Sequence, residues 1–271
     1  MKKLNLRDRV ITTDFDSFVM GIVNVTPDSF FDESRGGIER AKCLIDEGAD
    51  ILDLGAESTR PGSSYVSEEE EIKRIIPVIK EIRKFSNIPI SIDTRKAKVF
   101  EECLKEGADI LNDISALEDD ENLVELCAKE KVPVILMHKR ATPDVMQLNT
   151  EYEDIFNDVN DYLEKRVEYA LKNGIKEDKI ILDPGIGFGK SAEDNCTLIK
   201  KCGKLLDGKY PVLMALSRKS VIGALTGREV HERLVGTVTA DIISVLAGAS
   251  LIRVHDVKEA VDSLKVLKGL S

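Results

Sequence analysis

The sequence has no long hydrophobic run, few cysteines and histidines, and no excess of positive charge. A membrane-spanning helix needs about 18 or more consecutive apolar residues, and no such run is present. The first ten residues, MKKLNLRDRV, lack the apolar stretch of a signal peptide. The five cysteines form no C-x-x-C pair, and we interpret Cys43, Cys103 and Cys127 as buried apolar side chains on helices. These absences predict a protein of the reducing cytoplasm with no membrane partner.

The acidic balance of the chain limits the partners that it can bind. The net charge of -10 argues against a nucleic acid, which binds to a basic face. It does not exclude a small anionic substrate, because a local group of arginines, lysines and helix N-termini can bind one. The three histidines lie far apart, without the spacing of a zinc site. A hard cation that bridges to a phosphate needs only one or two protein oxygens, and Asn24 could supply one.

One pattern recurs along the chain: a buried apolar strand, a polar residue at its C-terminal end, a loop and a helix. The predicted strands cover residues 18–24, 51–54, 88–93, 109–112, 133–138, 180–183, 211–216 and 251–255. We expect helices at 38–47, 152–173, 221–225 and 233–247. A further helix should start at Ser67, where Glu70 completes a capping box, one should end at Gly107, one should start near Glu118, and the last should follow Asp256 as its cap.

Eight such units predict a single-domain α/β protein over residues 1–271 with the (β/α)₈ TIM barrel fold. An open doubly wound sheet is the alternative. The residues before the first strand could form a short hairpin that closes one end of the barrel.

In a barrel of this kind the active site lies where the strands end. The polar residues at these ends are Asn24, Asp53, Asp93, Asn112, His138, Asp183, Ser217, Arg253 and His255. Arg253 and His255 are two residues apart in one strand, so their side chains share a face. Two groups that can carry positive charge on one face predict an anion site. The alternative is that carboxylates in the core neutralise them.

The glycine-rich stretch after Asp183 matches a nucleotide-binding loop only in part. Gly189, Lys190 and Ser191 match the end of G-x-x-x-x-G-K-[ST], but Pro184 stands where the first glycine is required. The G-x-G-x-x-G spacing also fails, because Lys190 occupies its last position. The sequence therefore argues against a phosphate-binding loop of either type.

Eight motifs stand in order, each at a predicted strand end. They are MGIVNVTPDSF at 20–30, DLGAESTRPG at 53–62, SIDT at 91–94, NDI at 112–114, LMH at 136–138, LDPGIGFGK at 182–190, SRKSVIG at 217–223 and IRVHDV at 252–257. Together they resemble the dihydropteroate synthase family over almost the whole chain. Two departures from the family are a short loop after Phe30 and the sequence Arg95-Lys96-Ala97 after SIDT.

The resemblance implies a (β/α)₈ barrel, commonly a homodimer, that belongs to folate biosynthesis and is a target of sulfonamides. Such a transferase condenses 4-aminobenzoate with 6-hydroxymethyl-7,8-dihydropterin diphosphate, using Mg²⁺, to give 7,8-dihydropteroate. Two alternatives stay open. A methyltetrahydrofolate-dependent corrinoid methyltransferase is also a pterin-binding barrel, but it has no need of STRPG or SRKS. A non-catalytic pterin-binding paralogue is the other, and loss of Asn24, Lys219, Arg253 or His255 would favour it; all four are present.

The resemblance also implies which residues bind the pterin. Asp183 would accept hydrogen bonds from the N–H edge of the ring, helped by Asn112. Lys219 would donate to the ring acceptors, and Asp93 would stabilise positive charge on the pterin methylene. The full pterin set is Asp93, Asn112, Met137, Asp183, Lys219 and Arg253.

The other substrate groups receive residues in the same way. The diphosphate would be bound by Asn24, Arg253 and His255, with Asn24 also holding Mg²⁺. The catalytic candidates that the resemblance implies are Asp93, Lys219 and Asn24. The 4-aminobenzoate residues would be Phe30, Thr59, Arg60, Pro61, Phe188 and Ser220, although Phe30, Pro61 and Phe188 could instead only pack the loops. We also expect the loops at 25–37 and 55–64 to be mobile in the free protein and to close over bound pterin.

Overall fold

The structure is a computed structural model that describes residues 1–25, 33–57, 66–140 and 151–271. Its centre is a sheet of eight parallel strands. In order of pairing they are β8 (Ile180–Asp183), β7 (Val134–Met137), β6 (Ile110–Asp113), β5 (Ile90–Asp93), β4 (Ile51–Gly55), β3 (Phe18–Asn24), β10 (Leu251–Val254) and β9 (Leu213–Met214). A parallel bridge between Leu182 and Val212 connects the two ends of the sheet. The predicted barrel is confirmed.

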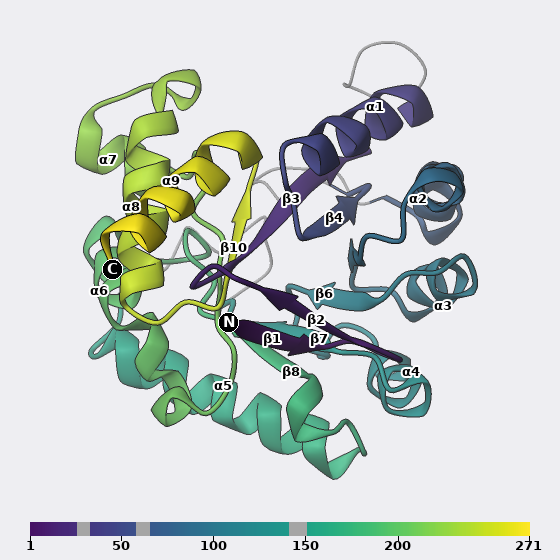
Figure 1. Ribbon diagram of the computed structural model, residues 1–271. Coiled ribbons are helices and arrows are strands. Elements are labelled where there is room, and N and C mark those ends of the chain that lie inside the picture. The colour runs from purple at the N-terminus through teal and green to yellow at the C-terminus, as the bar shows by residue number, and fades with distance from the viewer. Residues whose placement is uncertain (26–32, 58–65, 141–150) are drawn as a thin grey trace.

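Helices surround the strands on the outside of the barrel (Figure 1). They are α1 (Glu33–Asp46), α2 (Glu68–Phe85), α3 (Ala97–Lys105), α4 (Asn122–Glu130), α5 (Ile155–Lys172), α6 (Ala192–Lys201), α7 (Ser220–Thr226), α8 (Leu234–Leu246) and α9 (Val257–Leu270). Short 3₁₀ helices lie at Glu177–Lys179, Cys202–Gly208 and Val230–Glu232. Within the described ranges, none of the helices is long and apolar enough to cross a membrane.

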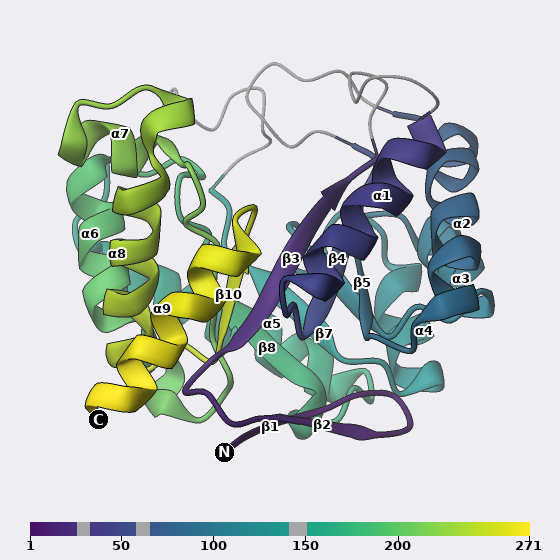
Figure 2. The same ribbon diagram turned by 45° about the horizontal axis from the view of Figure 1, so that its top comes forward.

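The apolar core has two layers because successive strand residues point to opposite faces. Outward residues such as Leu52, Ile92 and Leu136 pack with the helices in one large buried cluster. Inward residues form a second buried cluster inside the barrel, which also includes Leu4 and Leu6. These two leucines come from the hairpin of β1 (Lys2–Asn5) and β2 (Val10–Thr13) and the turn after β1. Figure 2 shows this hairpin across the end where the strands begin, which confirms the predicted closure of that end.

Several local signals act as the sequence predicts. The Ser67 hydroxyl accepts a hydrogen bond from the Glu70 N–H at 3.3 Å and caps α2. Gly48 follows α1 with a φ of 99°, a conformation that favours glycine. The strand at 18–24 has the predicted bounds.

Other expectations need correction. The helix expected near Glu118 begins at Asn122, since Ala116 and Leu117 have positive φ and the Asp113 carboxylate binds the N–H groups of Ser115 and Leu117. Asp256 does not cap α9 with its side chain, because that carboxylate binds Arg218 at 2.6 and 3.1 Å.

Bounds and burial also differ in places. The first helix begins at Glu33, five residues before the predicted start, and β9 covers only Leu213–Met214 of the predicted 211–216. Cys43 is exposed on α1, where its thiol donates to Glu47, so its predicted burial is wrong; Cys103 and Cys127 are buried as expected.

Candidate active site at the ends of the strands

The strand alternation brings the site residues together. Inward residues at one level of the barrel, Ile51, Ile110, Ile135, Ile181, Leu213 and Leu251, belong to the inner apolar cluster. Two positions further along the same strands stand Asp53, Asn112, Met137, Asp183, Ala215 and Arg253. Because side chains two apart share a face, these residues form the next level up, at the barrel mouth. On four of these six strands the inner face thus changes from apolar to polar within two residues, while Met137 and Ala215 remain apolar.

Arg253 joins two carboxylates at this level. Its Nε donates to Asp53 at 2.6 Å and its Nη2 to Asp93 at 2.9 Å. Asp53 is fully buried and also accepts a hydrogen bond from the Asn112 amide at 3.2 Å. A buried carboxylate needs such partners. Removing one partner of a buried charged pair costs roughly 3–5 kcal/mol, because the other charge is then left unpaired. Arg253 therefore pairs with two core carboxylates, and the anion site expected at Arg253 and His255 stays a prediction.

A second group lies where β8 ends. The Asp183 carboxylate accepts the Gly185 N–H at 2.7 Å. Lys219 donates to the Ile186 carbonyl at 2.6 Å, and its ammonium lies 4.9 Å from the centre of the Phe188 ring. We call Asp53, Asp93, Asp183, Lys219 and Arg253 the mouth cluster.

An apolar surface lies beside these charges. Ile114, Met137 and Phe188 form a buried cluster separate from the two layers of the barrel core. A flat ring with polar edges needs both features: an apolar face to stack on, and donors and acceptors at its rim. The arrangement suits a heterocycle such as a pterin.

Burial changes the protonation of the mouth cluster. It raises the pKa of Asp93 to about 7 against the opposing effect of Arg253, and raises the pKa of Asp183 against that of Lys219. It lowers the pKa of Lys219 to about 8, although Asp183 opposes this. Arg253 differs, since Asp53 and Asp93 outweigh its burial and raise its pKa. In three of the five groups, burial thus shifts the pKa toward the neutral form against the effect of a charged partner.

His255 and Ser217 lie just beyond the strand ends. The His255 ring nitrogen Nδ1 is 3.0 Å from the Ser217 hydroxyl. Burial and the nearby Arg253 lower the pKa of His255 to about 4. The expected cationic pair of Arg253 and His255 is therefore a single cation at neutral pH, and a bound anion would have to raise the pKa of His255 to recruit its charge.

The remaining predicted residues have different positions. Asn24 is exposed at the end of β3, and Ser220 is exposed at the start of α7. Phe30, Thr59, Arg60 and Pro61 lie outside the described residues, as do most of the two loops expected to be mobile. His138 follows Met137 and faces away from the mouth, with its ring 4.9 Å from that of Tyr162.

Sequence reasoning missed a role for Asp53 and for Lys190. Asp53 stands among the polar strand ends, and its place two residues after inward Ile51 is the signal that could have shown its contact with the mouth. Lys190 donates to three backbone carbonyls, a contact that no sequence pattern indicates.

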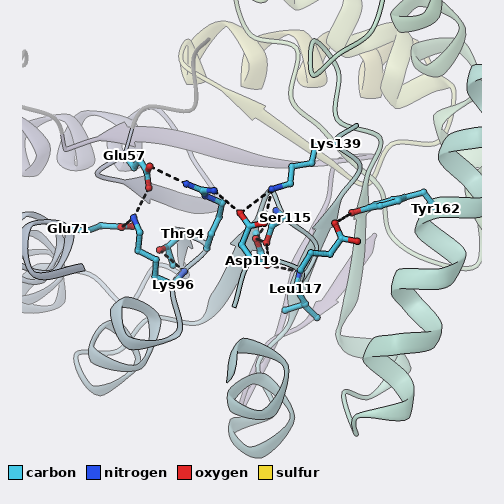
Figure 3. A network of polar contacts seen from close by, with 12 residues as sticks. Glu57, Glu71, Thr94, Lys96, Ser115, Leu117, Asp119, Lys139 and Tyr162 are labelled. Atoms are coloured by element: carbon cyan, nitrogen blue, oxygen red, sulfur yellow. Dashed lines mark hydrogen bonds and ion pairs between the residues drawn. The ribbon is translucent and has the colours of Figure 1, made fainter. Parts of the chain in front are cut away.

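A second set of charges forms a local network beyond the ends of β4 to β7 (Figure 3). Lys96 binds Glu57 at 2.6 Å and Glu71 at 2.7 Å. Arg95 binds Glu57 at 3.2 Å and Asp119 at 2.6 Å, and Asp119 also accepts from Lys139 at 3.1 Å. We call Glu57, Glu71, Arg95, Lys96, Asp119 and Lys139 the rim network.

Comparison with known proteins identifies the family and the fold. Residues 20–255 match the family described as pterin binding enzyme, so the barrel and its mouth are those of a pterin-binding enzyme. A dihydropteroate synthase of Clostridium beijerinckii is 42% identical over 95% of this chain and 93% of its own length. The chain belongs to the dihydropteroate synthase family, which confirms the resemblance of the motifs.

Solved structures agree with this assignment. Xanthomonas albilineans dihydropteroate synthase with 4-aminobenzoic acid has a TM-score of 0.92 and 40% identity, covering 99% of this chain and 97% of that one. The same enzyme in complex with 7,8-dihydropteroate has a TM-score of 0.88 and 38% identity, covering 99% and 98%.

Proposed function

We propose that this chain is the transferase that condenses 4-aminobenzoate with 6-hydroxymethyl-7,8-dihydropterin diphosphate, giving 7,8-dihydropteroate and diphosphate in folate biosynthesis. The observation that carries the proposal is the similarity to dihydropteroate synthases over 95% of the chain. The mouth cluster supports it, because buried donors and acceptors beside an apolar surface suit a pterin.

The pterin binds with its N–H edge on Asp183, whose second oxygen lies free of the Gly185 contact that the first one makes. Asn112 and Lys219 add a donor on either side, and Met137 contributes an apolar face. A carboxylate that accepts from two ring N–H groups makes the strong, charge-assisted kind of hydrogen bond. Such contacts also return to Asp183 the stabilisation that its burial removes.

The reaction breaks the bond between the pterin methylene and the diphosphate, and positive charge develops on that methylene. Asp93 stabilises the charge, because it is a buried carboxylate held in place by Arg253 at 2.9 Å. The amine of 4-aminobenzoate then forms the new C–N bond and loses a proton. Phe188 and Ser220, with Phe30, Thr59, Arg60 and Pro61, are the residues proposed to hold the 4-aminobenzoate.

Asn24, Arg253 and His255 are proposed to bind the diphosphate, with Mg²⁺ as the cofactor. Mg²⁺ usually keeps several waters and needs only one or two protein oxygens beside the substrate phosphates. The exposed Asn24 amide at the end of β3 fits this demand. Among the described residues, no group of three or more His, Cys, Asp or Glu side chains could hold a metal ion, so the fit is to a cation carried by the diphosphate. Bound there, Mg²⁺ would neutralise charge on the leaving diphosphate.

A homodimer is proposed from the surface of α7, α8 and α9. Leu225, Val235, Leu246, Val266 and Leu270 are large apolar side chains exposed on these helices. A groove of about 380 Å³ between α8 and α9 lies beside them. A second copy of the chain would bury this surface. Val235→Glu should give a monomer in light scattering, whereas Phe85→Glu on the distant α2 should not change the mass.

The cytoplasm is the proposed compartment. All five cysteines are free, and Cys43 is exposed. Free thiols of this kind persist in a reducing environment.

The test of the reaction is release of diphosphate from purified protein. Release should require both substrates and should rise with Mg²⁺. A sulfonamide, which resembles 4-aminobenzoate, should bind weakly to the protein alone and more tightly once pterin, diphosphate and Mg²⁺ are present. Release that needs only one substrate would contradict the proposed condensation, and equal sulfonamide affinity in both titrations would contradict the ordered binding.

A further inference from the structure

Lys190 ends the glycine-rich loop after β8, in the stretch that partly matches a phosphate-binding loop. Its ammonium does not point outward to an anion. It donates to the carbonyls of Gly185 at 2.8 Å, Phe188 at 3.1 Å and His138 at 3.4 Å, and the residue is only 5% exposed. Three carbonyl acceptors use all three hydrogens of an ammonium. We call these three oxygens the carbonyl cage.

Two carbonyls of the carbonyl cage belong to Gly185 and Phe188, which also contact Asp183 and Lys219 of the mouth cluster. The Gly185 N–H donates to Asp183 at 2.7 Å while its carbonyl accepts from Lys190. Phe188 carries the ring next to Lys219 and gives its carbonyl to Lys190. The third carbonyl, that of His138, follows β7 directly. One ammonium therefore connects the backbone beside Asp183, the backbone of Phe188 and the end of β7.

The loop needs a hydrogen-bond donor at this point. Gly185 has a φ of 69°, and a Cβ there would lie 1.9 Å from the His138 carbonyl oxygen, so the loop approaches β7 as closely as a glycine permits. This approach brings three carbonyl oxygens around one buried point. Without a donor between them the three oxygens would repel one another, which is unfavourable in a buried place. The carbonyls of His138 and Phe188 would also lose the Lys190 hydrogen bond, whereas the Gly185 carbonyl would keep the Phe188 N–H at 3.2 Å.

We propose that Lys190 is a positioning residue, which holds the loop at 184–189 so that Asp183 meets the pterin and Phe188 meets 4-aminobenzoate. Lys190 touches neither substrate and acts through the carbonyl cage. The inference rests on the proposed function. It deepens that function by giving both binding sites a common support. The charged groups around Lys190 are Asp183, Asp194 and Lys219.

The test compares Lys190→Met with Ser191→Ala. Methionine keeps the length of the side chain but removes all three donors. Ser191→Ala removes the cap of α6, one residue away, where the hydroxyl accepts from Asp194 at 3.1 Å, and serves as the control for loss of stability alone. Calorimetry with the dihydropterin diphosphate measures pterin affinity, steady-state rates give KM for 4-aminobenzoate and kcat, and thermal unfolding reports stability.

We expect Lys190→Met to bind the pterin about 10- to 100-fold more weakly, the loss that follows when an outer partner of a binding group is removed. KM for 4-aminobenzoate should rise with it, while kcat at saturation falls less, because Asp93 and Lys219 remain. Ser191→Ala should lose stability and keep both constants. If Lys190→Met does not fold, Lys190→Gln, which keeps two donors, carries the same comparison.

Each other outcome overturns the inference. Wild-type affinity in the Lys190 variants would mean that Lys190 does not position the site. Equal losses in the Lys190 variants and Ser191→Ala would mean that loop stability alone sets affinity. If the wild-type protein itself fails to bind the pterin, the proposed function fails first, and the calorimetry separates that result from the other two.

Discussion

The mouth cluster and the rim network both hold charged groups at the same end of the barrel. Burial disfavours charge in both, but charged partners outweigh burial in the rim network and not at three groups of the mouth cluster. In the rim network, burial disfavours the charge of Lys96, but its hydrogen bonds to Glu57 and Glu71 outweigh this effect and raise the pKa of Lys96. Asp119 likewise overcomes burial through Arg95 and Lys139, and its pKa is lowered. In the mouth cluster, burial outweighs the partners of Asp93, Asp183 and Lys219.

The difference lies in the number of partners. The rim network has three carboxylates and three cations, each in contact with an opposite charge. The mouth cluster has three carboxylates and two cations, and Arg253 serves two of the carboxylates. Asp183 and Lys219 bind mainly backbone groups instead. A polar ligand would supply the missing partners, in agreement with the binding site proposed at the mouth cluster.

The comparison predicts its largest effect at Asp183. Asp183→Asn keeps the size but places a donor against the pterin N–H groups. Loss of one partner in a buried charged pair costs roughly 3–5 kcal/mol, which corresponds to a fall in pterin affinity of about 10²- to 10³-fold. Calorimetry with the dihydropterin diphosphate measures this. The melting temperature should stay the same or rise, because burial opposes the charge of Asp183 in the free protein. Unchanged affinity would remove Asp183 from the pterin site.

The rim network should behave in the reverse way. Lys96→Met leaves the buried Glu71 without its cation and Glu57 with Arg95 alone, so stability should fall by roughly 3–5 kcal/mol while pterin affinity stays the same. Lys98→Met, two residues further on in α3, is the matched control, since Lys98 is exposed and its pairs with Glu68 and Glu69 should contribute less than about 1 kcal/mol. Thermal unfolding and calorimetry read out the two quantities. A Lys96 variant that loses affinity without losing stability would break the distinction between the clusters.

The pH profile tests the mouth cluster as a unit. In the proposed reaction the carboxylate form of Asp93 and the ammonium form of Lys219 would be the active ones, so kcat/KM should rise with pH up to about 7 and fall above about 8. The two limbs belong to the coupled cluster rather than to single residues. Lys219→Arg should remove the alkaline limb, because arginine does not titrate in this range. If kcat/KM of the wild-type protein varies by less than about a factor of two between pH 6 and 9, the role of these groups is contradicted.

The sequence could predict the barrel and the residues at its mouth because both follow from simple periodicities. Alternation places Asp53, Asn112 and Asp183 two positions beyond inward isoleucines, and parallel strands end at one rim. The motifs add the family, which the similar proteins confirm.

What the sequence could not predict are choices of partner between distant residues. Whether Arg253 meets an anion or Asp53 and Asp93 depends on which side chains the closed barrel places around it. The carbonyl cage of Lys190 depends on loop geometry, and no residue type marks a backbone carbonyl as an acceptor. The late start of α4 has a similar cause, because the Asp113 carboxylate competes for backbone N–H groups.

A buried carboxylate outside both clusters, that of Asp241, gives the smallest expected effect. Asp241 lies in α8, is 1% exposed, and neither of its carboxylate oxygens has a hydrogen-bond partner among the described residues. Burial, helped by the charge of Asp256, raises its pKa. It resembles the mouth cluster in protonation but takes no part in the proposed site.

Asp241→Asn should therefore stabilise the protein without changing pterin affinity. A raised pKa in the folded state gives stability that is present below the pKa of the unfolded chain and is lost as pH rises through the folded value. The gain of the variant over wild type should then be small at acid pH and grow toward alkaline pH, at about 2–4 °C in melting temperature for each kcal/mol. Asp262→Asn on the exposed face of α9, where Asp262 pairs with Lys265, is the control and should show no such trend. Loss of stability at every pH would show that the Asp241 carboxylate is charged and has a partner, and Asp241 would then belong with the rim network, where partners preserve charge.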